Sequence, residues 1–415
     1  MASLIFTVVG QALGGPFGAL VGGILGGAVD QAIAGPQKVE GPRLGDLSVQ
    51  ASSYGQPIPR LYGAENRVAG NLIWSTGLVE TKHVEKRGSF LTGTTKITTW
   101  TYHVDCAIGI GAVTGGIRSV RRIWADGKLF RDLDGNQKQA DEVRVYLGTE
   151  DQMPDPLLQA AVGADLCPAF RGLAYVVFDH LELADFGNRI PNFTFEVEAH
   201  ASATVATVID DLCDLGGVPF LDAAQTDYLD LRGYQIARPV SIRDAIQPLR
   251  TAWLFDAAEI EGELVFMPAD SPPVARVPAS DLAAHPFGSD RPPPCEGVRT
   301  ADVELPRQVT VQHLDPARDY QANSQRARRS TLNSAADLSI ELPMVLDAST
   351  AKGLAERLLS MAWTRRDAFS VQLPIAYLHV EAGHKLVVAQ GNGKERQLKV
   401  RRRELRLPGV VVAEC

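Results

Sequence analysis

Alternation of apolar or β-branched residues with polar residues is the main pattern between residues 47 and 199. It runs clearly through Thr95–Gly109 and Tyr175–Leu183, and Gly, Pro and Asp residues separate such stretches. A period of two places successive side chains on opposite faces of a strand, so each stretch predicts a β-strand. Within residues 117–132, Asp126-Gly127 separates two such strands, because a glycine after aspartate suits the positive φ of a tight hairpin turn.

Helical periodicity appears in four stretches with their own start or stop signals. In residues 203–217, apolar residues recur at helical spacing and Gly216 is the expected stop, while Ser241 is the expected N-cap of residues 241–253. The other two helices are expected at residues 156–162, after the N-cap Asp155, and at residues 348–365.

The order of these elements predicts a mainly β protein with an α+β insertion. Strands are expected again after residue 303, among them residues 396–405, and Glu261-Gly262 is expected to turn a further hairpin. Proline is concentrated in residues 271–297, and this concentration predicts a loop. The predicted division is an apolar, glycine-rich segment with a linker at 1–40, a β-rich domain at 41–200, an α+β domain at 201–300 and a second β-rich portion with one helix at 301–415.

The segment before the first predicted strand has no charged residue until Asp30. Its glycines recur every fourth residue, which in a helix would make one smooth groove for a second helix to approach. Glycine costs about 1 kcal/mol per helical position relative to alanine, so a lone helix here would be unstable in water. The predicted helix-packing residues are Gly10, Gly14, Gly18, Gly22 and Gly26, with Phe17, Leu20 and Leu25 beside them.

Three interpretations of this segment are open. A cleaved secretory signal would begin with basic residues, and none precedes Lys38. A membrane anchor would have Lys or Arg on one flank, whereas the first charge is Asp30. The third is an apolar tail that packs against copies of itself or against the helices of a partner.

Charge and composition disfavour several functional classes. The chain has 415 residues and a formal net charge of −8, which argues against a dedicated nucleic-acid-binding protein. Its five cysteines lie far apart with no C-x-x-C pair, so we expect free thiols, as in a reducing cytoplasm, and neither disulfides nor a metal site. The histidines form no metal-binding motif, and Asp210 and Asp214 share a helix face that we expect to be solvated. No catalytic residue, metal or cofactor is predicted.

Several long segments together resemble one family. They include Glu40–Trp74, residues 117–130 (IRSVRRIWADGKLF), Ala169–Glu198 and residues 346–374 (LDASTAKGLAERLLSMAWTRRDAFSVQLP). In this order they are similar to the hub proteins at the tip of siphophage tails and of gene transfer agents. The resemblance covers nearly the whole chain, including the glycine-rich N-terminus.

The resemblance implies a structural protein of the virion tail tip, made in the cytoplasm of a bacterial host. It implies a homotrimer that closes the tail tube, with two tube-like β-domains per chain so that three chains imitate six-fold symmetry. The implied partners are the distal tail protein, the tape-measure protein, a tail fibre or receptor-binding protein, genomic DNA in transit and, during ejection, the host membrane. The alternatives are a tail-associated cell-wall hydrolase and a membrane-active protein acting through its apolar N-terminus.

Overall fold

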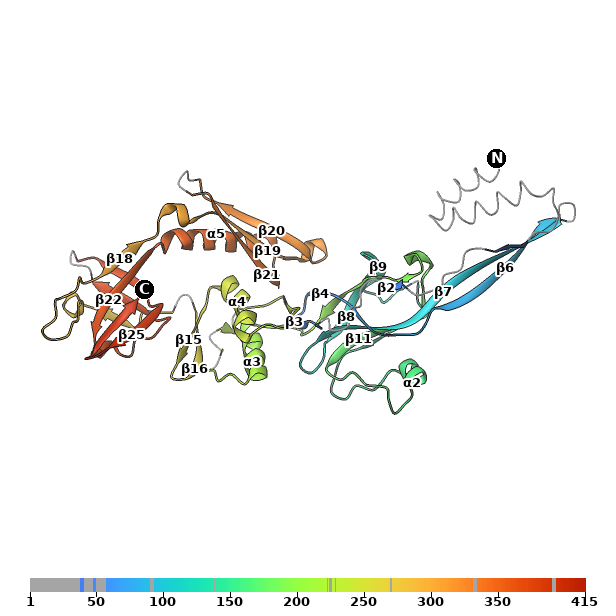
Figure 1. The fold of residues 1–415 in the computed structure, drawn as a ribbon, viewed down its shortest axis with the longest axis horizontal. Helices are drawn as coiled ribbons and strands as arrows, with labels where there is room; N and C mark the ends of the chain where they lie inside the picture. The colour runs from blue at the N-terminus through green and yellow to red at the C-terminus, as the bar shows by residue number, and fades with distance from the viewer. Residues whose placement is uncertain are drawn as a thin grey trace.

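Three units lie in a row along the long axis of the molecule in the computed structural model (Figure 1). The structure describes residues 57–415 and the strands at 38–40 and 48–49, and it leaves out residues 90–92, 138, 222, 224–225, 228, 269–270, 331–333 and 390–392. The predicted glycine groove from Gly10 to Gly26, with Phe17, Leu20 and Leu25, lies outside the described residues.

The N-terminal unit consists of two sheets that pack on one core. The larger sheet contains β10, β11 and β7, and the smaller has the order β4-β13-β8-β9. Inward-facing side chains from both sheets, such as Val176, Phe178, Ile123 and Phe195, are buried together. Its strands are β1 Lys38–Glu40, β2 Ser48–Val49, β3 Arg60–Gly63, β4 Asn66–Ala69, β5 Asn71–Ser75, β6 Val79–Ser89, β7 Gly93–Ala112, β8 Ser119–Ala125, β9 Lys128–Arg131, β10 Glu142–Tyr146, β11 Leu173–Glu182, β12 Arg189–Ile190 and β13 Phe193–Glu198.

Strand β11 is buried on both faces, because α2 (Pro156–Val162) and its flanking loop cover the side away from the main core. Tyr175 and Val177 pack there against Leu158 of α2 and Cys167. The predicted N-cap is confirmed, since the Asp155 carboxylate accepts from the backbone N–H groups of residues 157 and 158. The predicted turn at Asp126-Gly127 is confirmed as well, with φ values of +48° and +79°.

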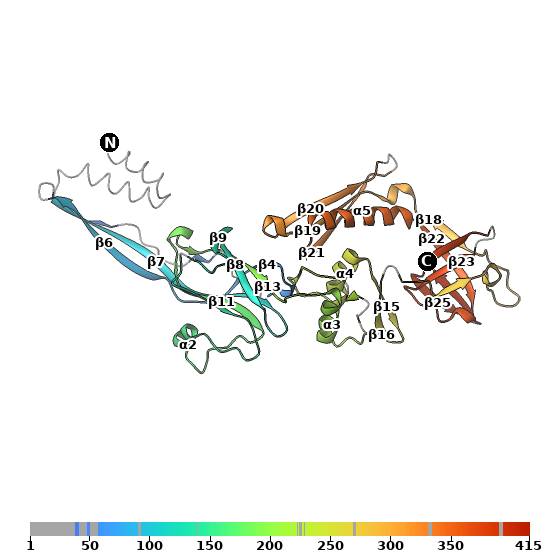
Figure 2. The same ribbon diagram turned by 180° about the vertical axis from the view of Figure 1, so that it is seen from behind.

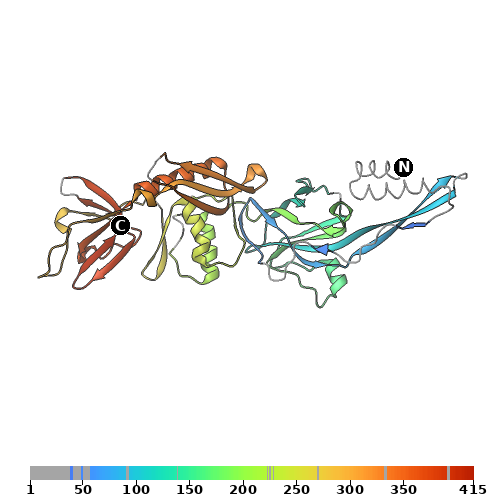
Figure 3. The ribbon, with the colours of Figure 1, turned by 45° about the horizontal axis from the view of Figure 1, so that its top comes forward.

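A long β-hairpin projects from this unit. Strand β6 pairs with the first part of β7 in unbroken antiparallel register, from Val79 opposite His103 to Ser89 opposite Gly93. The second part of β7 pairs with β11 and β5 in the body of the unit, and Trp100 and Tyr102 of the part that pairs with β6 also lie in the main core. The hairpin therefore forms an arm that extends beyond the two packed sheets (Figure 3).

The central unit combines helices and strands on one large core. Helix α5 packs across β19 and β20, and α4 lies beneath this layer beside α3 (Figure 2). The helix after residue 203 ends one residue later than predicted, because Gly217 rather than Gly216 adopts the left-handed C-cap conformation, with φ +59°. Its elements are α3 Val205–Gly216, β14 Gly233–Ile236, α4 Ile242–Trp253, β15 Asp256–Ile260, β16 Glu263–Met267, β19 Pro306–Asp315, β20 Gln321–Arg328, β21 Ala336–Val345 and α5 Ala348–Thr364.

The C-terminal unit has two sheets, β17-β23-β24 and β18-β22-β26-β25, around a small aliphatic core. The single strand expected at residues 396–405 is two strands in different sheets, because the buried Val400 separates them. The strands are β17 Ala275–Val277, β18 Glu296–Arg299, β22 Asp367–Pro374, β23 Lys385–Ala389, β24 Glu395–Lys399, β25 Arg402–Arg406 and β26 Val410–Glu414. The described residues include the 3-10 helices η1 Ala184–Phe186, η3 Ala279–Asp281, η4 Asp302–Glu304, η5 Pro316–Arg318 and η6 Ile375–Tyr377.

The mainly β architecture, with helices inserted in the middle, confirms the predicted fold class. Residues 275–299 join a core formed with residues 366–415, and residues 305–363 share a core with α3 and α4. The domain boundaries proposed at residues 40, 200 and 300 remain a prediction. Within the described residues, no helix is both long and apolar enough to cross a membrane.

Candidate functional site

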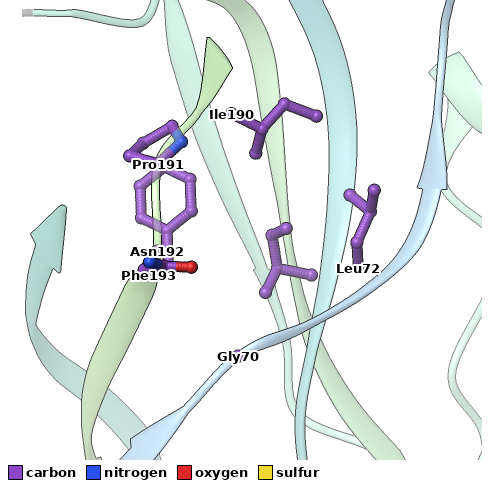
Figure 4. A pocket seen from close by; sticks show the side chains of 7 residues that line it. Gly70, Leu72, Ile190, Pro191, Asn192 and Phe193 are labelled. Carbon is purple, nitrogen blue, oxygen red and sulfur yellow. The ribbon is translucent and has the colours of Figure 1, made fainter. Parts of the chain in front are cut away.

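The described residues form a pocket of about 560 Å³, lined by Arg232 and Asp347 among others, and smaller cavities besides. One cavity of about 20 Å³ lies between β5 and the start of β13, with Leu72, Ile190 and Phe193 around it (Figure 4). Its volume is close to that of one water molecule, and its wall is mostly apolar. Among residues 57–415 as described, no group of three or more His, Cys, Asp or Glu side chains could hold a metal.

A set of ion pairs and hydrogen bonds lies where the N-terminal and central units meet. Strand β3 of the first unit pairs with β14 of the second in antiparallel register, from Gly63 opposite Gly233 to Arg60 opposite Ile236. Gly233 is required here, because a Cβ would collide with the backbone carbonyl of Glu65. The two units therefore share one sheet.

A second contact joins the end of β3 to helix α3. The Arg60 guanidinium lies 2.6 Å from the Asp211 carboxylate, which also accepts hydrogen bonds from the Tyr62 hydroxyl at 2.6 Å and the Thr114 hydroxyl at 2.9 Å. Both side chains of the ion pair are 21% exposed. Burial alone would raise the pKa of Asp211, but these hydrogen bonds outweigh it and hold the pKa below its ordinary value.

The third contact is made by the turn between β19 and β20. Tyr320 in this turn donates its hydroxyl to the buried Glu196 of β13 at 3.0 Å, and Arg122 of β8 contacts the same carboxylate. Arg122 also lies 3.1 Å from the Asp319 carboxylate. Arg67 of β4 donates to the Asp319 carbonyl at 2.8 Å. The turn is thus held by three strands of the smaller sheet.

Aromatic stacking and backbone conformation reinforce this contact. The guanidinium groups of Arg67 and Arg122 lie 4.1 and 4.8 Å from the ring centre of Trp124, which places them for cation–π interactions. Asp319 and Tyr320 both adopt positive φ, at +51° and +59°, which is costly for residues other than glycine. Burial and the neighbouring Glu196 raise the pKa of Tyr320, so its phenol is a hydrogen-bond donor.

Arg232 of the central unit makes a fourth contact across the junction. Arg232 makes a two-pronged contact with Glu65, with both distances 2.9 Å, and its guanidinium also reaches Asp347 at the start of α5. One arginine of the central unit thereby links a loop of the N-terminal unit to a helix of its own unit. We call the four contacts together the interunit junction.

Sequence reasoning did not identify the interunit junction. It predicted a solvated helix face for Asp210 and Asp214; Asp214 is exposed, but Asp210 is half-buried with one buried carboxylate oxygen, so that prediction is wrong for Asp210. It gave no role to Asp211 on the same helix. The partners of Asp211 and Glu196 lie 74 to 151 positions away in the chain. No local signal connects them.

Part of the sequence matches a known protein family, and the fold matches solved structures. A family described as putative phage tail protein matches residues 241–403. The structure is similar, with a TM-score of 0.72 and 28% identity, to a chain from the virion of a native gene transfer agent particle, over 98% of this chain and 95% of that chain. No curated protein matches the sequence.

Two bacterial tail proteins are more distant. A tail protein from Neisseria meningitidis MC58 is 12% identical, with a TM-score of 0.37, over 85% of this chain and 96% of that chain. The 43 kDa tail protein of prophage MuSo2 from Shewanella oneidensis is 9% identical, with a TM-score of 0.36, over 86% and 95%.

Proposed function

We propose that this phage tail protein, whose place is in the tail of a virion, is the hub that closes the distal end of the tail tube. The comparisons confirm the predicted family resemblance and the predicted location in the tail. The observation that carries the hub proposal is the similarity to a gene-transfer-agent virion chain over nearly the full length of both chains. In this role the protein joins the distal tail protein, the tape-measure protein and a tail fibre or receptor-binding protein, and it opens for DNA delivery.

The interunit junction supports a ring of three copies. A ring in which three chains imitate six-fold symmetry needs the units of each chain to keep a fixed position relative to one another. The shared β3–β14 pairing and the ion pairs Arg60–Asp211 and Arg232–Glu65 hold the N-terminal and central units in one relative position.

Symmetry at the tail tip tests this proposal. Electron microscopy of purified particles should show three copies of the chain around the tail axis. A single copy, a two-fold arrangement or a six-fold ring of this chain would contradict the hub assignment.

We also propose that the role is structural rather than enzymatic. The carboxylates of Asp211 and Glu196 are held in ion pairs and hydrogen bonds that join one unit to the next, which is a structural use of these groups. Incubation of the pure protein with host peptidoglycan should release no soluble fragments. Fragment release would favour the alternative of a cell-wall hydrolase.

For the apolar N-terminus we propose a plug or socket near the tube axis. Three copies converging there could pack through the groove of Gly18 and Gly22 and contact the tape-measure helices, and the uncharged segment could later enter the host membrane. Replacing Gly18 and Gly22 by leucine should impair tail assembly or DNA delivery while the β-rich units stay folded. Normal assembly and infection by this variant would contradict the proposal.

A further inference from the structure

We propose that neighbouring copies of this chain meet with the basic β20 edge of one copy against the acidic β10 edge of the next. The inference rests on the proposed ring and names the contact that closes it. The occupant of each edge is therefore a second copy of this chain.

Sheet topology places the two edges at opposite ends of one path. The strands run in the order β10-β11-β7-β3-β14-β21-β19-β20, with the interunit junction between β3 and β14 at its middle. Within the described residues, β10 pairs only with β11, and β20 pairs only with β19. An open strand edge presents unpaired backbone groups that a strand from another chain can meet.

The β20 edge is basic. Arg326 and Arg328 are exposed on β20, and neither forms an ion pair with any described residue. A groove of about 290 Å³ beside them is lined by Arg328, Arg329 and Lys352 of α5, with Glu356 as its acidic member. The Lys352 ammonium donates to the Arg326 carbonyl at 2.7 Å and also lies 3.4 Å from the Glu356 carboxylate, so the unpaired positive charges of this edge among the described residues are Arg326 and Arg328.

The β10 edge is acidic. Asp141 and Glu182 are exposed, and neither forms an ion pair within the described residues. The backbone N–H of Glu182 donates to the Gln139 carbonyl at 2.8 Å, and that of Asp141 donates to the Asp179 carbonyl at 3.1 Å, so both residues lie where the start of β10 meets the end of β11. Glu142 and Asp179 lie on the same two strands, directly opposite each other, and Arg144 contacts both.

Opposite charge selects one way of joining the edges. Two β20 edges would bring arginines together, and two β10 edges would bring carboxylates together, so pairing of like edges is disfavoured. Only the contact between different edges brings opposite charges together. Such head-to-tail contacts build a closed ring when the rotation per subunit allows it.

Charge reversal in the full-length chain tests this contact. The basic-edge variant carries Arg326→Glu and Arg328→Glu, and the acidic-edge variant carries Asp141→Lys and Glu182→Lys. Sedimentation of the purified protein and the copy number at the tail tip are the readouts. Each variant alone should raise the concentration for half-assembly by about ten-fold or more, and the combination of all four changes should restore assembly.

The matched control is Arg238→Glu with Arg243→Glu, two exposed arginines near the start of α4 with no ion pair among the described residues. It should assemble as the wild type does. If the wild type forms a three-fold ring and the edge variants assemble normally, the inference is wrong while the hub proposal stands. If Arg326→Glu with Arg328→Glu abolishes binding of duplex DNA but not ring formation, the basic edge serves DNA and the inference is also wrong. Absence of any ring in the wild type would overturn the hub proposal itself.

Discussion

Replacing Asp211 by asparagine should loosen the interunit junction without disturbing helix α3. The carboxylate receives charge-assisted hydrogen bonds from Arg60 and further hydrogen bonds from the hydroxyls of Tyr62 and Thr114. Asparagine has nearly the same shape and helix propensity, but it brings an N–H donor where three donors converge. The change therefore removes an interaction between units and preserves the local packing.

The magnitude follows from the burial of the ion pair. A hydrogen bond to a charged group contributes about 1.5–3 kcal/mol, and a charge left buried without its partner costs more. Because Arg60 and Asp211 are each 21% exposed, water weakens their attraction. We expect Asp211→Asn to reduce the free energy of unfolding of the joined units by about 2–3 kcal/mol.

Urea unfolding of the full-length protein measures this loss, and hydrogen exchange of β3 and α3 localises it. The control Asp214→Asn changes an exposed carboxylate on the same helix, so its effect should stay within about 0.5 kcal/mol. A double-mutant cycle of Asp211→Asn with Arg60→Met should give a coupling energy of at least about 1 kcal/mol. Equal effects of Asp211→Asn and Asp214→Asn, or a coupling near zero, would refute the reasoning.

Three further predictions concern other parts of the structure. Tyr320→Phe removes the hydroxyl that donates to the buried Glu196, so the β19–β20 turn should lose about 1–2 kcal/mol of local stability and its amide hydrogens should exchange faster; unchanged hydrogen exchange would contradict this. Asp155→Ala removes the N-cap of α2 and the buried carboxylate that pairs with Arg144, so the free energy of unfolding measured by thermal melting should fall by about 3–4 kcal/mol; a fall of less than about 1 kcal/mol would count against this. Burial lowers the pKa of His103 and of His313, so the unfolded state binds more protons and the urea midpoint should fall as the pH drops below about 6.5; a midpoint that rises on acidification would contradict the assignment.

Local features of this protein could be predicted from its sequence. The alternation in Thr95–Gly109 indicated a long strand, and β7 contains all of it. The turn at Asp126-Gly127 and the cap at Ser241 depend on neighbouring residues only, and both are present. Such features are set by backbone preferences and by side chains within a few positions.

The interunit junction could not be predicted in this way. Arg60 and Asp211 are 151 positions apart, and Tyr320 is 124 positions from Glu196. Each residue resembles an ordinary surface charge or strand residue in its own segment. Their roles follow from how β14 returns to pair with β3, and neither periodicity nor turn chemistry specifies that pairing.

The pairing of β3 with β14 also sets the order in which the units can fold while the chain is being synthesised. The main core of the N-terminal unit draws on residues from Leu61 to Ala199, so it can form once residue 199 has emerged. One edge of β3 then stays open until β14 is synthesised, and the central core waits further for α5. During this interval an unpaired strand is exposed to other nascent chains, which makes it the point of greatest risk for misassembly. Slowing translation between residues 199 and 233 would lengthen that exposure, whereas slowing it after residue 236 would not.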